Sequence, residues 1–457
     1  MAKANTSFYR TIWRWHFYAA LFVIPMILIL ATTGTTYLFK PQIDRWEERS
    51  WRGLPVAGAV TPDDQVAAAL AAFPGAKFNS YRLPAAEGDA ALVHIALKDQ
   101  AMRDVFVSPQ GVVLGALNPK TRIMQVAHDI HGQLLIGKQG SWLVELAASW
   151  AIVMIITGLY LWWPRGRGAA GVLWPRLSGG NRLVWRDLHA VTGFWVSGLA
   201  MVLLLTGLPW ADVWGSAFKA VRAEMGWVKG QQDWTIGGRL PTPDADEHAE
   251  HNHATMQGSV SMAGMSGHDH GMTHVALDTI VARARSEHLA FPVLVTPPGG
   301  KGGFGAKRVM AWTVRSDTQN RPERVTITYD AMTGKEQSRE TFADKHVIDR
   351  VVGYGVAWHE GALFGAVNQV IGVLTGLALI VLAVSGFVLW RKRKPEGRLG
   401  APPLPDRRVA SLGLKVVIAA LFVFLPLFAV SLVALWLFDR FALPHLPRLA
   451  QWLGLEV

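Results

Sequence analysis

The chain has 457 residues, of which 51% are hydrophobic and 17% charged, and its formal net charge is +11. A composition this apolar and this poor in charge excludes an ordinary soluble domain and indicates an integral membrane protein. Because the sequence contains no cysteine, disulfides, iron–sulfur clusters and cysteine-based zinc sites are excluded as well.

Five apolar stretches are long enough to cross a bilayer, which takes about 20 residues per helix. Several end in tryptophan, tyrosine or phenylalanine, as expected for rings at the level of the lipid headgroups. The first stretch is too long for a signal-peptide core and has no small-residue cleavage site after it, so we expect a retained anchor. The stretches cover approximately residues 17–39, 142–163, 190–210, 363–390 and 412–438.

Lysine and arginine gather in three segments that flank these spans, and all three fall on one side if the spans alternate. By the positive-inside rule that side is the cytoplasm. The net charge is then mainly a topology signal, and nucleic acid is not an expected partner. The basic residues are Lys3, Arg10 and Arg14 before the first span, Arg165, Arg167, Arg176, Arg182 and Arg186 between the second and third, and Arg391, Lys392, Arg393, Lys394, Arg398, Arg407 and Arg408 between the fourth and fifth.

The two long segments on the outer side carry similar patterns. Each predicts one helix, near 61–73 and near 277–288, packed against a small antiparallel sheet. The expected strands lie near 77–83, 91–97, 103–107 and 112–114 in the first segment, and near 293–296, 309–315 and 324–329 in the second. The expected fold is therefore a membrane α-helical bundle with two small α+β outer domains.

The expected segments follow one another without overlap. They are helix 1 (1–40), outer domain 1 (41–130), helix 2 (131–165), a cytoplasmic loop (166–188), helix 3 (189–211), outer domain 2 (212–358), helix 4 (359–391), a second cytoplasmic loop (392–410), helix 5 (411–439) and a tail (440–457).

Histidines recur at matched positions in the two halves of the chain. The spacing from His16 to Gly34 equals that from His189 to Gly207. Likewise, the spacing from His131 to Gly158 equals that from His359 to Gly386, again without a gap. The chain is therefore predicted to be a tandem repeat of span, outer domain and span, with a fifth span appended.

These histidines form one pair per side of the membrane. His16 and His189 fall at the cytoplasmic ends of their helices, and His131 and His359 fall just beyond the outer ends of theirs. Helix bundles build cofactor sites from facing helices, and two neutral imidazoles can supply both axial ligands of a haem iron. We therefore predict two non-covalent b-type haems in a four-helix bundle, ligated by His16 with His189 and by His131 with His359. The alternative is a structural role at the interface, inherited by duplication.

His128 is a second candidate beside His131, one helical turn earlier. Its counterpart in the other repeat is Val356, whereas His131 corresponds to His359. We therefore favour His131 as the ligand and keep His128 as a substitute ligand or a group near the haem propionates.

A low-complexity insert occurs only in the second repeat, over residues 248–274. Its imidazole and thioether side chains are ligands that suit Cu(I), so it is a candidate copper-handling segment; the alternative is incidental metal binding. The candidate ligands are His248, His251, His253, His268, His270, His274, Met256, Met262, Met265 and Met272.

Several motifs resemble the PepSY-associated transmembrane family of bacterial inner-membrane proteins. They are Trp15-His16-Phe17-Tyr18 leading to Thr33-Gly34, Tyr37-Leu38-Phe39-Lys40-Pro41, His131-Gly132-Gln133-Leu134-Leu135 with Gly137, Gly158-Leu159-Tyr160-Leu161-Trp162-Trp163-Pro164-Arg165, and the turn from Asp330 to Thr333-Gly334. The resemblance covers almost the whole chain apart from the insert and the last span. It implies a multi-pass inner-membrane protein with a cytoplasmic N-terminus and periplasmic PepSY-like domains.

The family includes di-haem ferric-siderophore reductases. By that resemblance the four histidines would be the axial ligands, and the chain would pass electrons to a periplasmic Fe(III)-siderophore and release Fe(II). Some members carry a cytosolic flavodoxin-like or nicotinamide-binding domain, whereas Trp390 is followed here by a basic loop, one span and a short tail. We therefore expect a separate donor, either a membrane quinol or a cytosolic reductase.

Two other functions fit the same sequence. The haems and the insert could form a periplasmic copper reductase, or the outer domains could act as a peptidase-modulating scaffold with purely structural histidines. An absorbance spectrum of the purified protein separates the redox functions from the scaffold.

Overall fold

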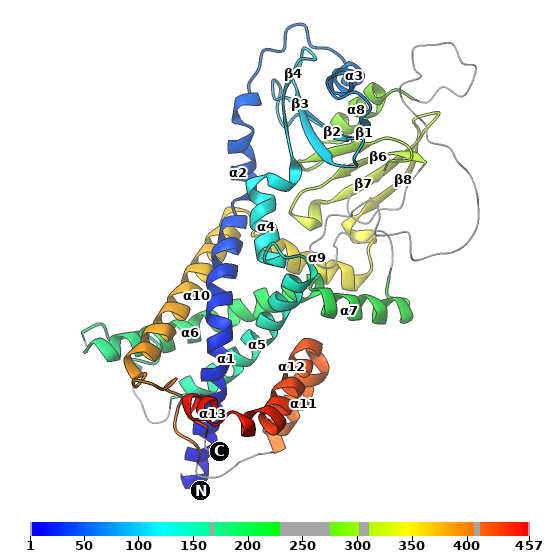
Figure 1. Ribbon diagram of the computed structural model, residues 1–457. Helices are drawn as coiled ribbons and strands as arrows, with labels where there is room; N and C mark the ends of the chain where they lie inside the picture. The colour runs from blue at the N-terminus through cyan, green and yellow to red at the C-terminus, as the bar shows by residue number, and fades with distance from the viewer. Residues whose placement is uncertain are drawn as a thin grey trace.

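The computed structural model describes residues 2–164, 169–178, 180–228, 275–300, 310–405 and 412–455. The chain forms a helical bundle with a β-sheet at one end, and both termini lie at the opposite end (Figure 1). We call these the sheet end and the terminal end. The candidate copper ligands at 248–274 lie outside the described residues.

Five helices in the described ranges are long and apolar enough to cross a membrane, so the chain is a multi-pass membrane protein, as the hydropathy pattern predicted. Four of these candidate spans lie in α1 (Ala2–Tyr37), α5 (Lys138–Trp162), α6 (Asn181–Gly207) and α10 (Ala366–Arg393). These four pack on one another: α1 contacts α5 and α10, and α6 contacts the same two helices. The fifth candidate covers Pro426–His445.

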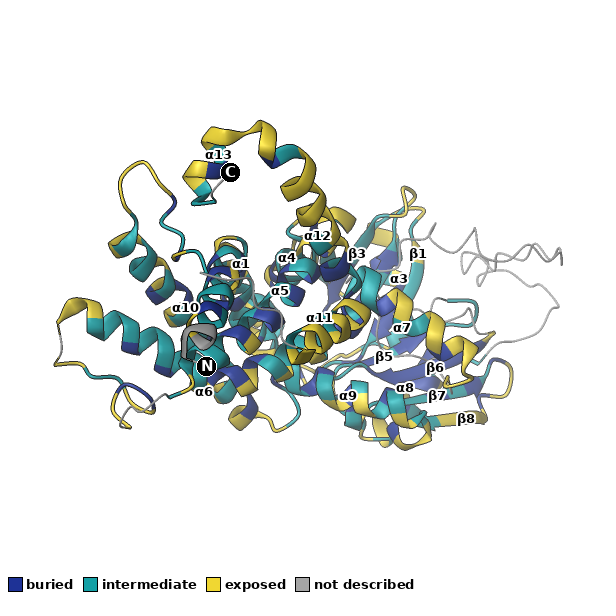
Figure 2. Ribbon diagram, turned by 90° about the horizontal axis from the view of Figure 1, so that it is seen from below, coloured by how far each residue is buried: buried dark blue, intermediate teal, exposed yellow. Residues whose placement is uncertain are grey.

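The fifth span differs from the single helix predicted over 411–439. The helix is interrupted at Leu425, which separates α11 (Leu412–Phe424) from α12 (Pro426–Leu437). Proline at the first position of α12 has no amide hydrogen to donate and disfavours helical backbone at the residue before it. Leu425 accordingly has φ −122° and ψ 87°. Seen from below, α11 and much of α12 are exposed along the outside of the bundle (Figure 2).

Shorter helices connect the bundle to the sheet and close the terminal end. Two of them, α4 and α9, carry His131 and His359, which therefore precede the spanning helices rather than belonging to them. The bounds are α2 (Lys40–Glu47), α3 (Pro62–Ala72), α4 (Ile123–Gln133), α7 (Asp212–Glu224), α8 (Leu277–Ser286), α9 (Val347–His359) and α13 (Pro447–Leu453).

The two predicted small sheets are one sheet. Eight antiparallel strands follow the order β4-β3-β2-β1-β5-β6-β7-β8, so each repeat contributes four neighbouring strands. The halves join because edge strands β1 and β5 pair, with Tyr81 opposite Val295 and Arg82 opposite Leu294. Strand β8 was not predicted. The bounds are β1 (Lys77–Arg82), β2 (Ala91–Ala96), β3 (Met102–Val107), β4 (Val113–Leu117), β5 (Val293–Thr296), β6 (Ala311–Ser316), β7 (Val325–Asp330) and β8 (Glu336–Thr341).

One hydrophobic core spans both halves of the sheet. Helices α3 and α8 bury Val66 and Ile280 against strand residues such as Val93 and Val314. Because side chains alternate along a strand, Leu92 points to the opposite face and packs in a second cluster beneath the sheet. The sheet end is therefore one structural unit built from two repeats, not two independent domains.

The first turns of α3 and α8 meet in a reciprocal contact. The Asp63 amide donates to Asp278 Oδ1 at 2.9 Å, and the Asp278 amide donates to Asp63 Oδ2 at 3.0 Å. Each carboxylate thus satisfies a free amide at the start of the other helix. Burial, together with the neighbouring Asp278, raises the pKa of Asp63 to about 6.

This junction predicts a pH dependence of stability. A carboxyl whose pKa is raised on folding stabilises the fold below its unfolded pKa, near 4, and loses that contribution as the pH rises through about 6. Asp63→Asn keeps an acceptor oxygen without the charge. The variant should therefore unfold about 2 °C above the parent at pH 7.5, after allowing for solvent screening of a half-buried group, and the difference should shrink towards pH 4.5. Thermal unfolding followed by tryptophan fluorescence tests this, and a difference independent of pH would contradict it.

Candidate functional site

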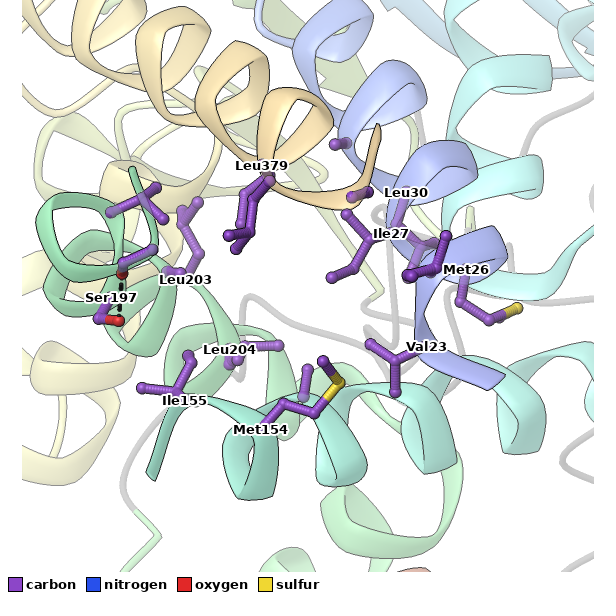
Figure 3. Close-up of a pocket in the computed structure, with 18 of the residues that line it drawn as sticks. Val23, Met26, Ile27, Leu30, Met154, Ile155, Ser197, Leu203, Leu204 and Leu379 are labelled. Carbon is purple, nitrogen blue, oxygen red and sulfur yellow. Dashed lines mark hydrogen bonds between the residues drawn. The ribbon is translucent and has the colours of Figure 1, made fainter. Parts of the chain in front are cut away.

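A cavity of about 1580 Å³ extends along the inside of the bundle. It is lined by α1, α4, α5, α6, α9 and α10, and its lining includes all four predicted histidines. Single ligand pockets usually hold about 300–1,000 Å³, so this volume exceeds what one small cofactor needs. Figure 3 shows a close-up of apolar lining from four helices, including Val23, Met154, Leu203 and Leu379.

The histidines stand in two pairs within this cavity. The ring centroids of His16 and His189 are 6.4 Å apart, and those of His131 and His359 are 6.2 Å apart. These are the partners expected from the repeat. Each pair brings together equivalent residues of the two halves, so the bundle is built around an approximate two-fold relation.

Each histidine is held through its Nδ1 atom by a hydroxyl residue or carbonyl of a facing helix. In the first pair His16 Nδ1 lies 3.0 Å from Thr157 Oγ1, and that hydroxyl donates its one hydrogen to Val153 O at 2.8 Å. The hydroxyl oxygen must therefore accept the hydrogen on Nδ1. The other contacts are His131 with Thr33 Oγ1 at 3.1 Å, His359 with Thr206 Oγ1 at 3.1 Å, and His189 with Leu382 O at 3.0 Å and Ser385 Oγ at 3.3 Å.

This hydrogen bonding assigns the tautomer of the rings. Thr33 and Thr206 also donate their hydrogens to carbonyls of their own helices, and a carbonyl opposite His189 can only accept. With the hydrogen on Nδ1, the Nε2 atom keeps its lone pair and can bind a metal. Burial lowers the pKa of His131 to about 3 and also lowers the pKa of His359, so both rings are neutral.

Each imidazole also lies on a glycine that directly follows its hydroxyl partner. A Cβ atom placed on Gly34 would lie 3.0 Å from Cε1 of His131, closer than ordinary van der Waals contact. The same distances are 3.2 Å from Gly158 to His16, 3.1 Å from Gly386 to His189 and 3.5 Å from Gly207 to His359. The four glycines that mark the repeat in the sequence therefore leave the space that the rings occupy, and we call them the glycine seats.

The seats connect the two spans of each repeat. His16 on α1 lies on Gly158 of α5, and His131 on α4 lies on Gly34 of α1. Sequence reasoning did not identify Thr157 and Ser385 as ring partners. The signal that could have found them is the four-fold recurrence of threonine or serine followed by glycine.

Ion pairs attach the sheet to the helix that carries His131. Arg122, at the start of α4, lies 3.1 Å from Glu47 and 2.9 Å from Glu48, and its guanidinium is also 3.8 Å from Asp104 of β3. The positive-φ residue Leu134 ends α4 directly after Gln133. His131 is thus positioned by the sheet above it as well as by α1 beside it.

A second set of buried ion pairs holds the helix that carries His359. Arg222 of α7 donates to Asp349 in the first turn of α9 at 2.6 Å, and both side chains are almost fully buried. Arg321 donates to Glu360, the residue after His359, at 3.2 Å. Removing one partner of such a buried pair strongly destabilises a fold. The two pairs therefore fix the position of α9.

His128 lines the cavity, and its ring pairs with no other imidazole among the described residues. Its ring is 5.8 Å from that of Tyr37, and its Nδ1 is 3.3 Å from Asp129 Oδ1. It lines the cavity on the same helix as His131, and its role as a substitute ligand or as a group near the haem propionates stays a prediction.

The donor set suits haem better than a bare metal ion. Across the described ranges, no group of three or more histidine, aspartate or glutamate side chains is placed to hold a metal ion. Two imidazoles alone are too few for a tetrahedral site, whereas a porphyrin brings four nitrogens of its own. With metal–nitrogen bonds of about 2 Å, two imidazoles bound on opposite sides of one ion would place their ring centres about 6.3 Å apart, which agrees with the spacing in both pairs.

Comparison with known protein families identifies the family of this chain. The family described as PepSY-associated TM region matches residues 13–393, which include the four histidines and their glycines. The chain therefore belongs to this family, as the motifs predicted. A search of curated proteins found no match.

Proposed function

We propose that this member of the PepSY-associated TM region family is a di-haem b membrane protein that reduces a ferric siderophore on its sheet side. The observation that supports it is the pair of imidazole couples, each with Nδ1 engaged, Nε2 available and the ring spacing of two ligands on one iron. His16 and His189 would hold one haem, and His131 and His359 the other.

Each bound haem would supply a one-electron Fe(III)/Fe(II) couple. The chain's residues do the rest: the seats orient the imidazoles, and the apolar lining keeps water from the path between the pairs. Arranged one towards each end of the bundle, the two sites would form an electron route across the bilayer.

The direction follows from charge. The basic flanks lie at the terminal end, and by the positive-inside rule they support a cytoplasmic position for that end in a bacterial inner membrane, with the sheet in the periplasm. A quinol or a cytosolic reductase would deliver electrons at the terminal end. At the sheet end, a haem held by His131 and His359 would supply the one-electron reduction of the Fe(III) chelate, after which the chelator would release Fe(II).

The test is a spectrum and a reaction. Purified protein should bind two haems per chain, extractable into acid acetone because no cysteine tethers them, with the sharp reduced α-band of six-coordinate haem. Mixing the reduced protein with a ferric siderophore in a stopped-flow instrument should reoxidise the haems. A colourless protein would instead support a scaffold.

Deleting residues 248–274 separates iron from copper as the acceptor. The insert occurs in only one repeat, whereas each haem site uses both, so the deletion should leave two haems bound and their spectra intact. Reoxidation by a ferric siderophore should be unchanged. If Cu(II) is the physiological acceptor, its reduction should fall at constant haem content, and loss of ferric-chelate reactivity would contradict the assignment of the insert as dispensable.

A further inference from the structure

Three arginines line the cavity, and all lie towards the terminal end. Arg182 precedes His189 by two turns on α6, Arg186 precedes it by one, and Arg393 lies two turns beyond Gly386 on α10. Since His189 lies on Gly386, the arginines follow the His16–His189 pair towards the end of the bundle.

Two of these cations have no anionic partner among the described residues. Arg186 is paired with Asp187, its Nε donating at 3.0 Å. In contrast, neither Arg182 nor Arg393 forms an ion pair with a carboxylate in the part of the chain that the structure describes. Both line the same end of the cavity, and two like charges beside an apolar cavity are unfavourable without an anion to balance them.

Contacts with two rings and a backbone carbonyl fix the position of the Arg393 guanidinium. Its guanidinium carbon lies 5.1 Å from the ring centres of both Trp13 and Phe17, and its Nη2 donates to Gly400 O at 2.9 Å. Its Nε is buried without a hydrogen-bond partner. An unsatisfied donor on a fixed guanidinium that lines the cavity indicates a ligand with acceptor oxygens.

The sheet end of the cavity lacks this feature. Towards this end the charged lining residues are Glu145, near the start of α5, and Glu360, the residue after His359, and the described lining contains no arginine or lysine there. The cations therefore mark only the His16–His189 end of the cavity, where an anionic ligand would balance them.

We propose that Arg182 and Arg393 bind the two propionate carboxylates of the haem held by His16 and His189, and so set that haem with its carboxylate edge towards the terminal end. A b-type haem carries two such carboxylates, and guanidinium groups match carboxylates with paired hydrogen bonds. The inference rests on the proposed function, because it needs a haem at this pair.

Neutralising the propionates also favours the reduced iron. Without the two cations, the negative carboxylates stabilise the more positive Fe(III) state. Arg182 and Arg393 therefore raise the reduction potential of the haem at His16 and His189 and leave the other haem unaffected, so the two haems differ in reduction potential.

The experiment uses the full chain loaded with haem or with haem dimethyl ester, whose propionates are masked. In the double variant Arg182→Gln/Arg393→Gln, transfer of one haem to excess apomyoglobin should be about tenfold faster than in the parent, whereas ester transfer should not change. Potentiometric titration should show a lower midpoint for that haem alone. Lys392→Gln removes a neighbouring exposed charge that does not line the cavity and should match the parent.

Faster loss of haem and ester alike would mean that the arginines support the fold and would overturn the inference, as would unchanged haem loss. If the parent binds haem but the variant gives one of these two results, the proposed function stands and only the inference about the arginines fails. A parent chain that binds no haem would overturn both.

Discussion

In the proposed di-haem protein, replacing His131 with alanine should reduce the haem content from two per chain to one. The His131–His359 pair would lose one of its two imidazoles, which leaves only His359 of that pair to hold the haem. His359→Ala should give the same result, while His16→Ala or His189→Ala should remove the other haem. The measurement is the haem-to-protein ratio together with the Soret absorbance of each purified variant.

His128→Ala is the matched control, because His128 lines the same cavity on the same helix but has no imidazole partner. It should leave two haems bound, with at most a small shift of the spectrum. If His128→Ala loses a haem and His131→Ala does not, the ligand assignment from the repeat is wrong.

Filling a glycine seat should disturb the same site without removing a ligand. In Gly34→Val the new side chain would begin 3.0 Å from Cε1 of His131 and would push the ring away from its position opposite His359. We expect the sheet-end haem to be lost or to become five-coordinate, whereas the haem at His16 and His189 stays six-coordinate. Gly34→Ala should have a smaller effect, since a single methyl group requires the ring to move by only a few tenths of an ångström.

Gly198→Val controls for valine in a membrane helix. Gly198 lies on α6, and a Cβ placed there meets nothing within 4 Å. This variant should keep both haems and their spectra, as measured by optical and electron paramagnetic resonance spectroscopy. Equal haem loss from Gly34→Val and Gly198→Val would show that helix insertion, and not the seat, is affected.

Local patterns determined much of this protein. The five apolar stretches, the positions of β1, β2 and β5, and the spacing of four histidines to four glycines are all legible in the sequence. Each depends on periodicity or spacing within one element or one repeat, and duplication preserves spacing because equivalent helices must present equivalent residues. Pro426 is also visible in the sequence. Because the residues around it are apolar throughout, the hydropathy pattern predicted one continuous helix and not the interruption between α11 and α12.

Only the tertiary structure decided how these parts meet. The pairing of Tyr81 with Val295 joins two sheets into one, and edge strands carry no sequence mark of their eventual partner. Similarly, Gly34 was visible as a repeat position, but that it seats His131, and that Thr33 holds the same ring, depends on how closely α1 and α4 approach. Contacts between helices distant in the chain follow from side-chain packing across the whole bundle, which no local periodicity encodes.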